Sequence, residues 1–144
     1  MKPRRLFAPL LLALLLAAPA GAEQKQSIGA FDAHYSLVPT LFLKPEIAAR
    51  HGITRSRDRA LLNVSILDAS DVPVQAQVTG RSRNLLGQEV RLQFRQVLDG
   101  QAVYYLAEVQ HADREMLRFI VDVTTPDSAA HRLEFMQTMY WEGR

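Results

Sequence analysis

The sequence predicts an all-β fold, an immunoglobulin-like antiparallel β-sandwich of about seven strands with one short helix. Three consecutive runs, residues 88–98, 102–109 and 117–123, carry the prediction. In the first and third runs an apolar side chain recurs at every second position, and successive side chains of a strand point to opposite faces. Such a strand has one apolar face, which a second sheet covers in a sandwich.

Four further runs bring the expected number of strands to about seven. Residues 23–27 are polar and are expected to lead into the first strand, and residues 41–43 are expected to continue along a sheet edge after Pro39. Residues 84–87 are expected to form a turn or bulge before the 88–98 run. The four further runs are 31–37, 60–67, 72–78 and 133–141.

A short helix is expected within residues 44–52. Pro45 suits the first helical position, where a missing N–H is tolerated. Glu46 in the first turn and Arg50 in the last turn follow the order that the helix dipole favours. Gly52 then provides a C-terminal stop, so the segment is expected to join two strands through a single helical stretch.

Asp99-Gly100 is the clearest turn signal in the chain. Asp-Gly between two apolar runs suits a two-residue type I′ hairpin, in which both central residues need a positive φ. The pair is therefore expected to join residues 88–98 and 101–109 as antiparallel neighbours.

The first 22 residues have the features of a cleaved secretory signal peptide. Lys2, Arg4 and Arg5 precede a nearly unbroken apolar run, and Ala20-Gly21-Ala22 ends it with small residues. The run is shorter than the roughly 20 apolar residues that span a bilayer, so cleavage is favoured over an uncleaved anchor. We expect one mature domain, residues 23–144, in the periplasm of a Gram-negative cell, without stable membrane insertion after cleavage.

Charge and cysteine content narrow the possible functions. The first 22 residues hold three of the 17 basic side chains and none of the 15 acidic ones, which leaves 14 basic against 15 acidic side chains. This balance gives no support for binding to nucleic acid. The chain has no cysteine, which excludes disulfides, thiolate metal sites and a cysteine nucleophile. An exported domain of this kind must rely on its apolar core for stability.

Three strand segments resemble a family of small exported proteins of Gram-negative bacteria that is classified as a domain of unknown function. The resemblance lies in residues 59–67, 84–87 and 102–108 and extends over about residues 23–141. It implies a single periplasmic domain and brings no catalytic or binding residues with it.

The residues that could carry chemistry are scattered along the chain. The four histidines show no metal-binding spacing, and no serine lies in a motif of activated hydroxyls. Met116, Met136 and Met139 suggest a copper carrier, because thioether ligands suit Cu(I). An unbroken strand would, however, point Met136 and Met139 to opposite faces, and gap-filling in the core is the alternative interpretation. We therefore predict no catalytic residue, resident cofactor or metal site.

Arg55, Arg57 and Arg59 would share one face of an extended chain. If their loops approach, Arg50, Arg81 and Arg83 could join them and form a patch for an anionic partner. The alternative is an exposed edge strand whose charges prevent aggregation.

The last run ends in Tyr140-Trp141. Alternation is expected to turn Trp141 into the core with Leu133, Phe135 and Met139, and to leave Tyr140 facing solvent. A partner surface is the alternative role for Trp141, and Tyr140 is a further candidate for partner contact.

The favoured function is a non-enzymatic binding or accessory module of the periplasm whose partner is an unidentified envelope protein. The alternative is a carrier of a small ligand or of copper. A hydrolase is a third class, and it would need a nucleophile and a base within hydrogen-bonding reach.

Overall fold

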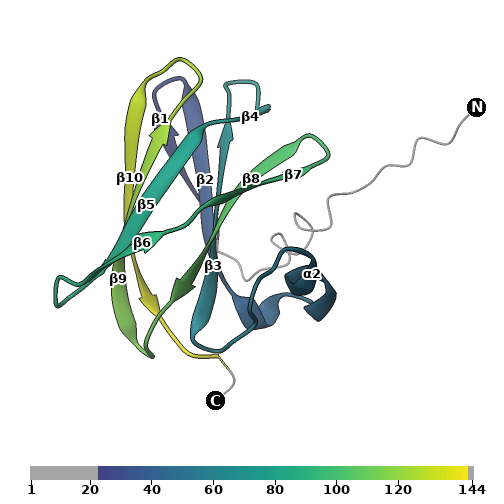
Figure 1. The fold of residues 1–144 in the computed structure, drawn as a ribbon. Coiled ribbons are helices and arrows are strands. Elements are labelled where there is room, and N and C mark those ends of the chain that lie inside the picture. Colours follow the sequence, from purple (N-terminus) through teal and green to yellow (C-terminus); the bar gives the residue numbers. More distant parts are fainter. Residues whose placement is uncertain (1–22, 143–144) are drawn as a thin grey trace, which may run out of the picture.

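The computed structural model describes residues 23–142, which form two antiparallel β-sheets that face each other (Figure 1). The strands are β1 (Glu23–Ile28), β2 (Phe31–Pro39), β3 (Arg59–Leu67), β4 (Pro73–Val74), β5 (Gln77–Asn84), β6 (Glu89–Leu92), β7 (Arg95–Asp99), β8 (Ala102–Gln110), β9 (Glu115–Thr124) and β10 (Ala130–Met139). Sheet A has the order β1-β2-β3-β8-β7, with β4 paired to β3, and sheet B has the order β10-β9-β5-β6. The predicted antiparallel sandwich is confirmed, with ten strands in the described residues instead of about seven. The predicted signal peptide, residues 1–22, lies outside the described residues.

The two sheets enclose the main hydrophobic core. Phe135 of β10 stacks on Tyr35 of β2 and on Phe119 of β9, with ring centroids 4.3 Å and 5.0 Å apart, and so joins both sheets through aromatic contacts. The inward side chains of β9 are the ones that alternation predicted, and all of them are buried: Leu117, Phe119, Val121 and Val123.

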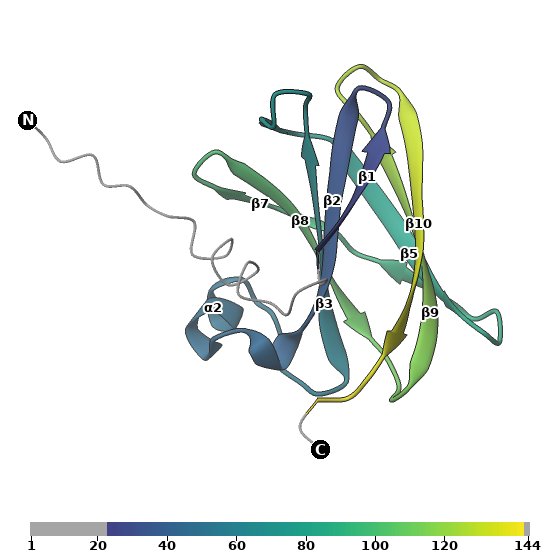
Figure 2. The same cartoon turned by 180° about the vertical axis from the view of Figure 1, so that it is seen from behind.

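A second, smaller core covers the outer face of sheet A. This core lies between sheet A and the helical segment that contains η1 (Thr40–Phe42) and α2 (Pro45–Arg50). Figure 2 shows α2 beside β3. Ile47 and Ala48 of α2 pack with Leu61 of β3 and Leu106 of β8. The central strands are therefore buried on both faces, which explains the nearly continuous apolar sequence of β8.

The short helix occurs where the sequence predicts it. Pro45 occupies the first turn of α2, and Glu46 and Arg50 lie at the ends that suit their charges. Gly52 has a φ of +64° just after the helix, and the N–H of Ile53 donates to the Ala48 carbonyl at 2.8 Å. The predicted extension of a strand at 41–43 is wrong, because η1 forms there and the buried Thr40 hydroxyl bonds to the carbonyl of Arg59 at 3.0 Å.

Two runs that the sequence presents as single strands each divide between the sheets. Residues 88–98 form β6 in sheet B and β7 in sheet A, and residues 72–78 form β4 in sheet A and the start of β5 in sheet B. Gly80 permits the first crossing, because a Cβ atom there would lie 3.1 Å from the Phe94 ring and 3.0 Å from the Ile120 carbonyl oxygen. Tyr105 marks the second crossing, since its hydroxyl accepts the N–H of Ala76 at 2.7 Å.

The expected polar lead-in is also a strand. β1 pairs along its whole length with β2, and Gly29, with a φ of +63°, makes the turn between them. As an edge strand β1 buries only Ile28 among its described side chains, so its sequence lacks the alternation of a half-buried strand.

Asp99-Gly100 makes the expected hairpin in a different turn. β7 and β8 are antiparallel neighbours as predicted, but Asp99 is itself paired with Ala102, so the two turn residues are Gly100 and Gln101. Among them only Gly100 has a positive φ. Because a type I′ turn needs two such residues, that prediction is wrong, and the pattern is that of a type II′ turn.

Candidate functional site

The three arginines of the predicted anion patch do not lie on one strand. Arg55 and Arg57 belong to the loop before β3, where the Arg59 N–H donates to the Ser56 carbonyl in a turn. Arg55 donates to the Leu41 carbonyl at 3.0 Å, and Arg59 lies 4.0 Å from Glu108. The shared face of an extended chain is therefore not formed, and both side chains have intramolecular contacts. Anion binding by these arginines stays a prediction.

Arg57 instead contacts Trp141, in the segment that follows β10. Its guanidinium carbon lies 4.5 Å from the centroid of the Trp141 ring. The Trp141 backbone N–H donates to Asp113 at 3.0 Å, and its indole N–H donates to the His111 carbonyl at 3.2 Å. Trp141 is thus outside the inter-sheet core, and its predicted position is wrong, because β10 and its alternation end at Met139. Tyr140 faces solvent as predicted.

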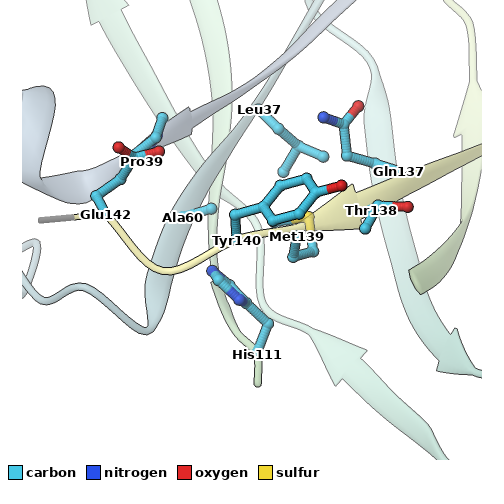
Figure 3. Close-up of a pocket in the computed structure, with 9 residues that line it drawn as sticks. All are labelled: Leu37, Pro39, Ala60, His111, Gln137, Thr138, Met139, Tyr140 and Glu142. Atoms are coloured by element: carbon cyan, nitrogen blue, oxygen red, sulfur yellow. The ribbon is translucent and has the colours of Figure 1, made fainter. Parts of the chain in front are cut away.

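A small cleft opens beside this C-terminal segment (Figure 3). Its volume is about 100 Å³, and its walls come from β2, β3, β10 and the residues that follow β8 and β10. Met139 and His111, both buried, lie in the cleft with Tyr140 and Glu142 at its rim. The sequence predicted Met139 in the core and did not indicate that His111 lies beside it.

The second candidate site is the loop between β5 and β6, which projects from the body of the sandwich (Figures 1 and 2). Asn84 holds the loop closed: its side-chain oxygen accepts the N–H groups of Leu86 at 3.0 Å and Gln88 at 2.9 Å. Its amide group donates to the Gln88 side chain at 2.7 Å, and its carbonyl accepts the N–H of Gly87 at 3.0 Å. Gly87 has a φ of +82°, which a tight turn of this kind requires.

The loop presents two large apolar side chains to solvent. Leu85 is 78 % exposed and Leu86 is 84 % exposed, although their own backbone is fixed by Asn84. We call Leu85 and Leu86 the leucine tip. The sequence predicted the turn at this place, but it gave no sign that both leucines would be exposed.

Charged side chains cover the outer face of sheet B behind the leucine tip. Glu89 binds Arg81 at 3.4 Å and Arg83 at 3.1 Å. The register places arginines directly opposite each other in two pairs, Arg81 with Arg91 and Arg83 with Arg118. The face carries five arginines and three acidic residues: Arg81, Arg83, Arg91, Arg118 and Arg132, with Glu89, Asp122 and Glu134.

The described residues hold no cluster of three or more His, Asp or Glu side chains that could bind a metal ion. Met136 is 49 % exposed on the outer face of sheet B, whereas Met139 is buried, so the predicted opposite orientation of these two methionines is confirmed. Among residues 23–142, no helix has the length and apolar character of a membrane span.

The fold and these surfaces define a class of protein, a small antiparallel β-sandwich with a protruding loop between two strands of one sheet. The chain belongs to the DUF4426 family, a domain of unknown function, which matches residues 25–142. The resemblance that the three strand segments suggested is thereby confirmed. None of the curated protein sequences compared matches the chain.

One solved structure supports the same family assignment, and two others share the fold. A DUF4426 family protein from Pseudomonas aeruginosa PAO1 is 32% identical, with a TM-score of 0.77, over 85% of this chain and 98% of that one. A copper-bound variant of FetP from uropathogenic Escherichia coli strain F11 has a TM-score of 0.60 at 9% identity, over 83% of this chain and 96% of FetP. FetP in its as-isolated form gives a TM-score of 0.59, also at 9% identity, over 85% of this chain and 96% of FetP. At that identity, the likeness to FetP shows the fold alone.

Proposed function

We propose that this protein is a non-enzymatic binding module of the periplasm that docks a partner protein through the leucine tip. The exposure of Leu85 and Leu86 on a loop with fixed backbone carries the proposal. Two adjacent leucines leave apolar area in water, where burial of one leucine side chain is worth roughly 1.5–3 kcal/mol. Because Asn84 already orders the loop, a partner gains this burial with little further loss of conformational freedom.

The charges behind the tip indicate the chemistry of the partner. Arg81 faces Arg91 and Arg83 faces Arg118 across neighbouring strands, and like charges in such positions repel each other. An acidic rim around an apolar groove would relieve that repulsion and cover the leucines together. A second copy of this chain would instead bring one arginine-rich face against another, so a different protein fits better.

A membrane surface fits the tip less well than a protein does. Two leucines supply roughly 3–6 kcal/mol of burial at most. A single myristoyl chain, at about 0.8 kcal/mol per buried CH₂, supplies more and still gives only marginal membrane binding. The acids Glu89 and Asp122 also offset part of the positive charge that would attract anionic lipids.

The periplasmic and non-enzymatic parts of the proposal rest on the sequence. The first 22 residues have the pattern of a secretory signal, and the chain has neither cysteine nor an activated-serine motif. Periplasmic localisation would be checked by osmotic-shock fractionation of cells that produce the full chain. Recovery of the protein in the cytoplasmic fraction alone would contradict that part.

The docking surface can be tested by site-specific photocrosslinking in living cells. A photoreactive phenylalanine analogue would replace Leu86 in one variant and Leu98 in another. Leu98 lies on the edge of sheet A and is 60 % exposed, so it is a matched apolar control away from the tip. A discrete adduct is expected from position 86 and not from position 98.

Binding measurements with the crosslinked partner, once purified, complete the test. Replacing both tip leucines by serine should weaken binding at least about tenfold, because one buried leucine alone is worth roughly 1.5–3 kcal/mol. Leu98→Ser should leave binding unchanged. An adduct made only with this chain itself, equal adducts from both positions, or flotation of the protein with anionic vesicles in place of an adduct would each overturn the proposal.

A further inference from the structure

We propose that the cleft beside the C-terminal segment is a Cu(I) site in which His111 supplies an imidazole nitrogen and Met139 a thioether sulfur. The cleft, of about 100 Å³, is large enough for a metal ion but small for an organic ligand. It is separate from the leucine tip, and the inference does not depend on the proposed docking of a partner.

The first step concerns the His111 ring. The side chain is only 7 % exposed, and Nδ1 lies 2.9 Å from the carbonyl oxygen of Ala112. A carbonyl can only accept, so Nδ1 carries the proton and Nε2 carries the lone pair. Nε2 belongs to the same ring, lines the cleft with it, and is not among the fully buried side-chain atoms that lack a partner within residues 23–142. Because the ring lines the cleft and Nδ1 carries the proton, the lone pair of Nε2 is available to a ligand there.

The same arrangement is the one that metal-binding histidines use. A ligating imidazole almost always donates its second ring N–H to a carbonyl or carboxylate, which fixes the tautomer and the direction of the free nitrogen. In this protein the Ala112 carbonyl is the acceptor for the second ring N–H of His111. The backbone of His111 is fixed as well. Its N–H donates to the Asp58 carbonyl at 2.9 Å, and the His111 carbonyl accepts the indole N–H of Trp141.

The second step concerns the kind of metal. Met139 lines the cleft with His111, and a thioether is a soft ligand that selects Cu(I) among the common biological metals (Figure 3). Zinc prefers four ligands and calcium prefers several oxygen ligands. The described residues hold no cluster of three or more His, Asp or Glu side chains for either ion. Leu37 and Pro39 also line the cleft, and such apolar side chains favour an ion of low charge over a strongly hydrated one.

The test is a Cu(I) titration of the purified full-length product under anaerobic conditions, with a coloured Cu(I) chelator as competitor. The wild-type protein should bind one Cu(I), and X-ray absorption at the copper edge should show both nitrogen and sulfur neighbours. His111→Ala and Met139→Leu should each weaken binding by at least about 100-fold. Met136→Leu is the matched control, because Met136 is exposed on the outer face of sheet B, and it should not change the affinity.

The spectrum of the wild-type protein keeps the proposal testable if a variant fails to fold. A copper edge without a sulfur neighbour would overturn it. So would the lack of stoichiometric Cu(I) binding, or equal loss of affinity in Met136→Leu and Met139→Leu. Circular dichroism of each variant would show whether a lost affinity has its origin in the site or in the fold.

Discussion

Arg57 and Trp141 form a cation–π pair that joins the loop before β3 to the segment after β10, with 4.5 Å between the guanidinium carbon and the ring centroid. Such a pair is worth roughly 0.5–1 kcal/mol where it is exposed to solvent. Arg57→Ala should therefore lower the free energy of unfolding by about that amount, as measured by urea denaturation. Trp141→Ala should cost more, because it also removes the indole hydrogen bond to the His111 carbonyl.

This prediction also separates the two interpretations of the arginine cluster. If Arg55 and Arg57 formed only a surface patch for an anion, reversing both to glutamate would abolish binding and leave the melting temperature unchanged. The observed contacts of Arg57 with Trp141 and of Arg55 with the Leu41 carbonyl predict a lower melting temperature instead. An unchanged melting temperature of the double reversal would contradict the structural assignment.

Asn84 determines the order of the leucine tip. Asn84→Ala removes the acceptor of the Leu86 and Gln88 N–H groups and should leave the tip flexible. Asn84→Asp keeps that acceptor and serves as the control. Native-state hydrogen exchange should show faster exchange at Leu86 and Gln88 in the alanine variant, with little change in β9. Equal protection of these two amides in both variants would show that the turn holds without the Asn84 side chain.

The sequence predicted the elements whose burial has a simple period. The β9 side chains Leu117 and Phe119 were placed correctly, because every second side chain of that strand points into the core. α2 was placed correctly because Pro45 and Gly52 mark its two ends by local chemistry. These signals depend on neighbouring residues alone, so a single sequence is enough to read them.

Crossings between the sheets have no such signal. Alternation continues from Leu92 of β6 to Phe94 before β7, because both side chains point into the sandwich while the backbone changes sheets. The period of a strand indicates which face is apolar and does not indicate which sheet the strand joins. The two split runs and the polar edge strand β1 account for the difference between about seven expected and ten observed strands.

The candidate sites were harder still to predict from the sequence. Leu85 and Leu86 are apolar and therefore resemble core residues in the sequence. They point to solvent because they lie in the turn that the Asn84 side chain closes. His111 and Met139 come together because the end of β8 and the end of β10 lie at the same end of the sandwich. Ligands that two separate strands bring together show no spacing that a motif could describe.

Acidic pH should weaken the turn between β9 and β10. A hydrogen bond from the Thr125 hydroxyl, supported by the Ala129 N–H, holds the pKa of Asp127 below its ordinary value of 3.8. A carboxyl group with a lowered pKa in the folded state contributes stability above its unfolded pKa and loses it as the pH falls through the folded value. Asp127→Asn should therefore lower the free energy of unfolding near neutral pH.

The pH profile provides the control for this prediction. The difference in unfolding free energy between Asp127→Asn and the wild type should shrink as the pH falls below the ordinary pKa of 3.8 and through the lower pKa of the folded state, since the wild-type carboxyl is then becoming protonated as well. Urea denaturation at a series of pH values would measure it. A difference that stays constant from neutral pH down to pH 2 would show that the charge of Asp127 has no part in stability.

The second core under α2 should contribute substantially to stability, since Ile47 of the helix is only 2 % exposed against Leu61 and Leu106 of sheet A. Ile47→Ala should lower the free energy of unfolding by about 2–5 kcal/mol, the range for a buried isoleucine that leaves a cavity. Phe42→Ala is the matched control, because Phe42 lies in η1 of the same segment and is 47 % exposed, so its cost should be below about 0.5 kcal/mol. If the helical segment were a detachable cover, Ile47→Ala would speed hydrogen exchange in residues 40–53 alone and leave global unfolding unchanged. Because Leu61 and Leu106 belong to strands that also build the main core, we expect the loss to appear in the global transition measured by urea denaturation.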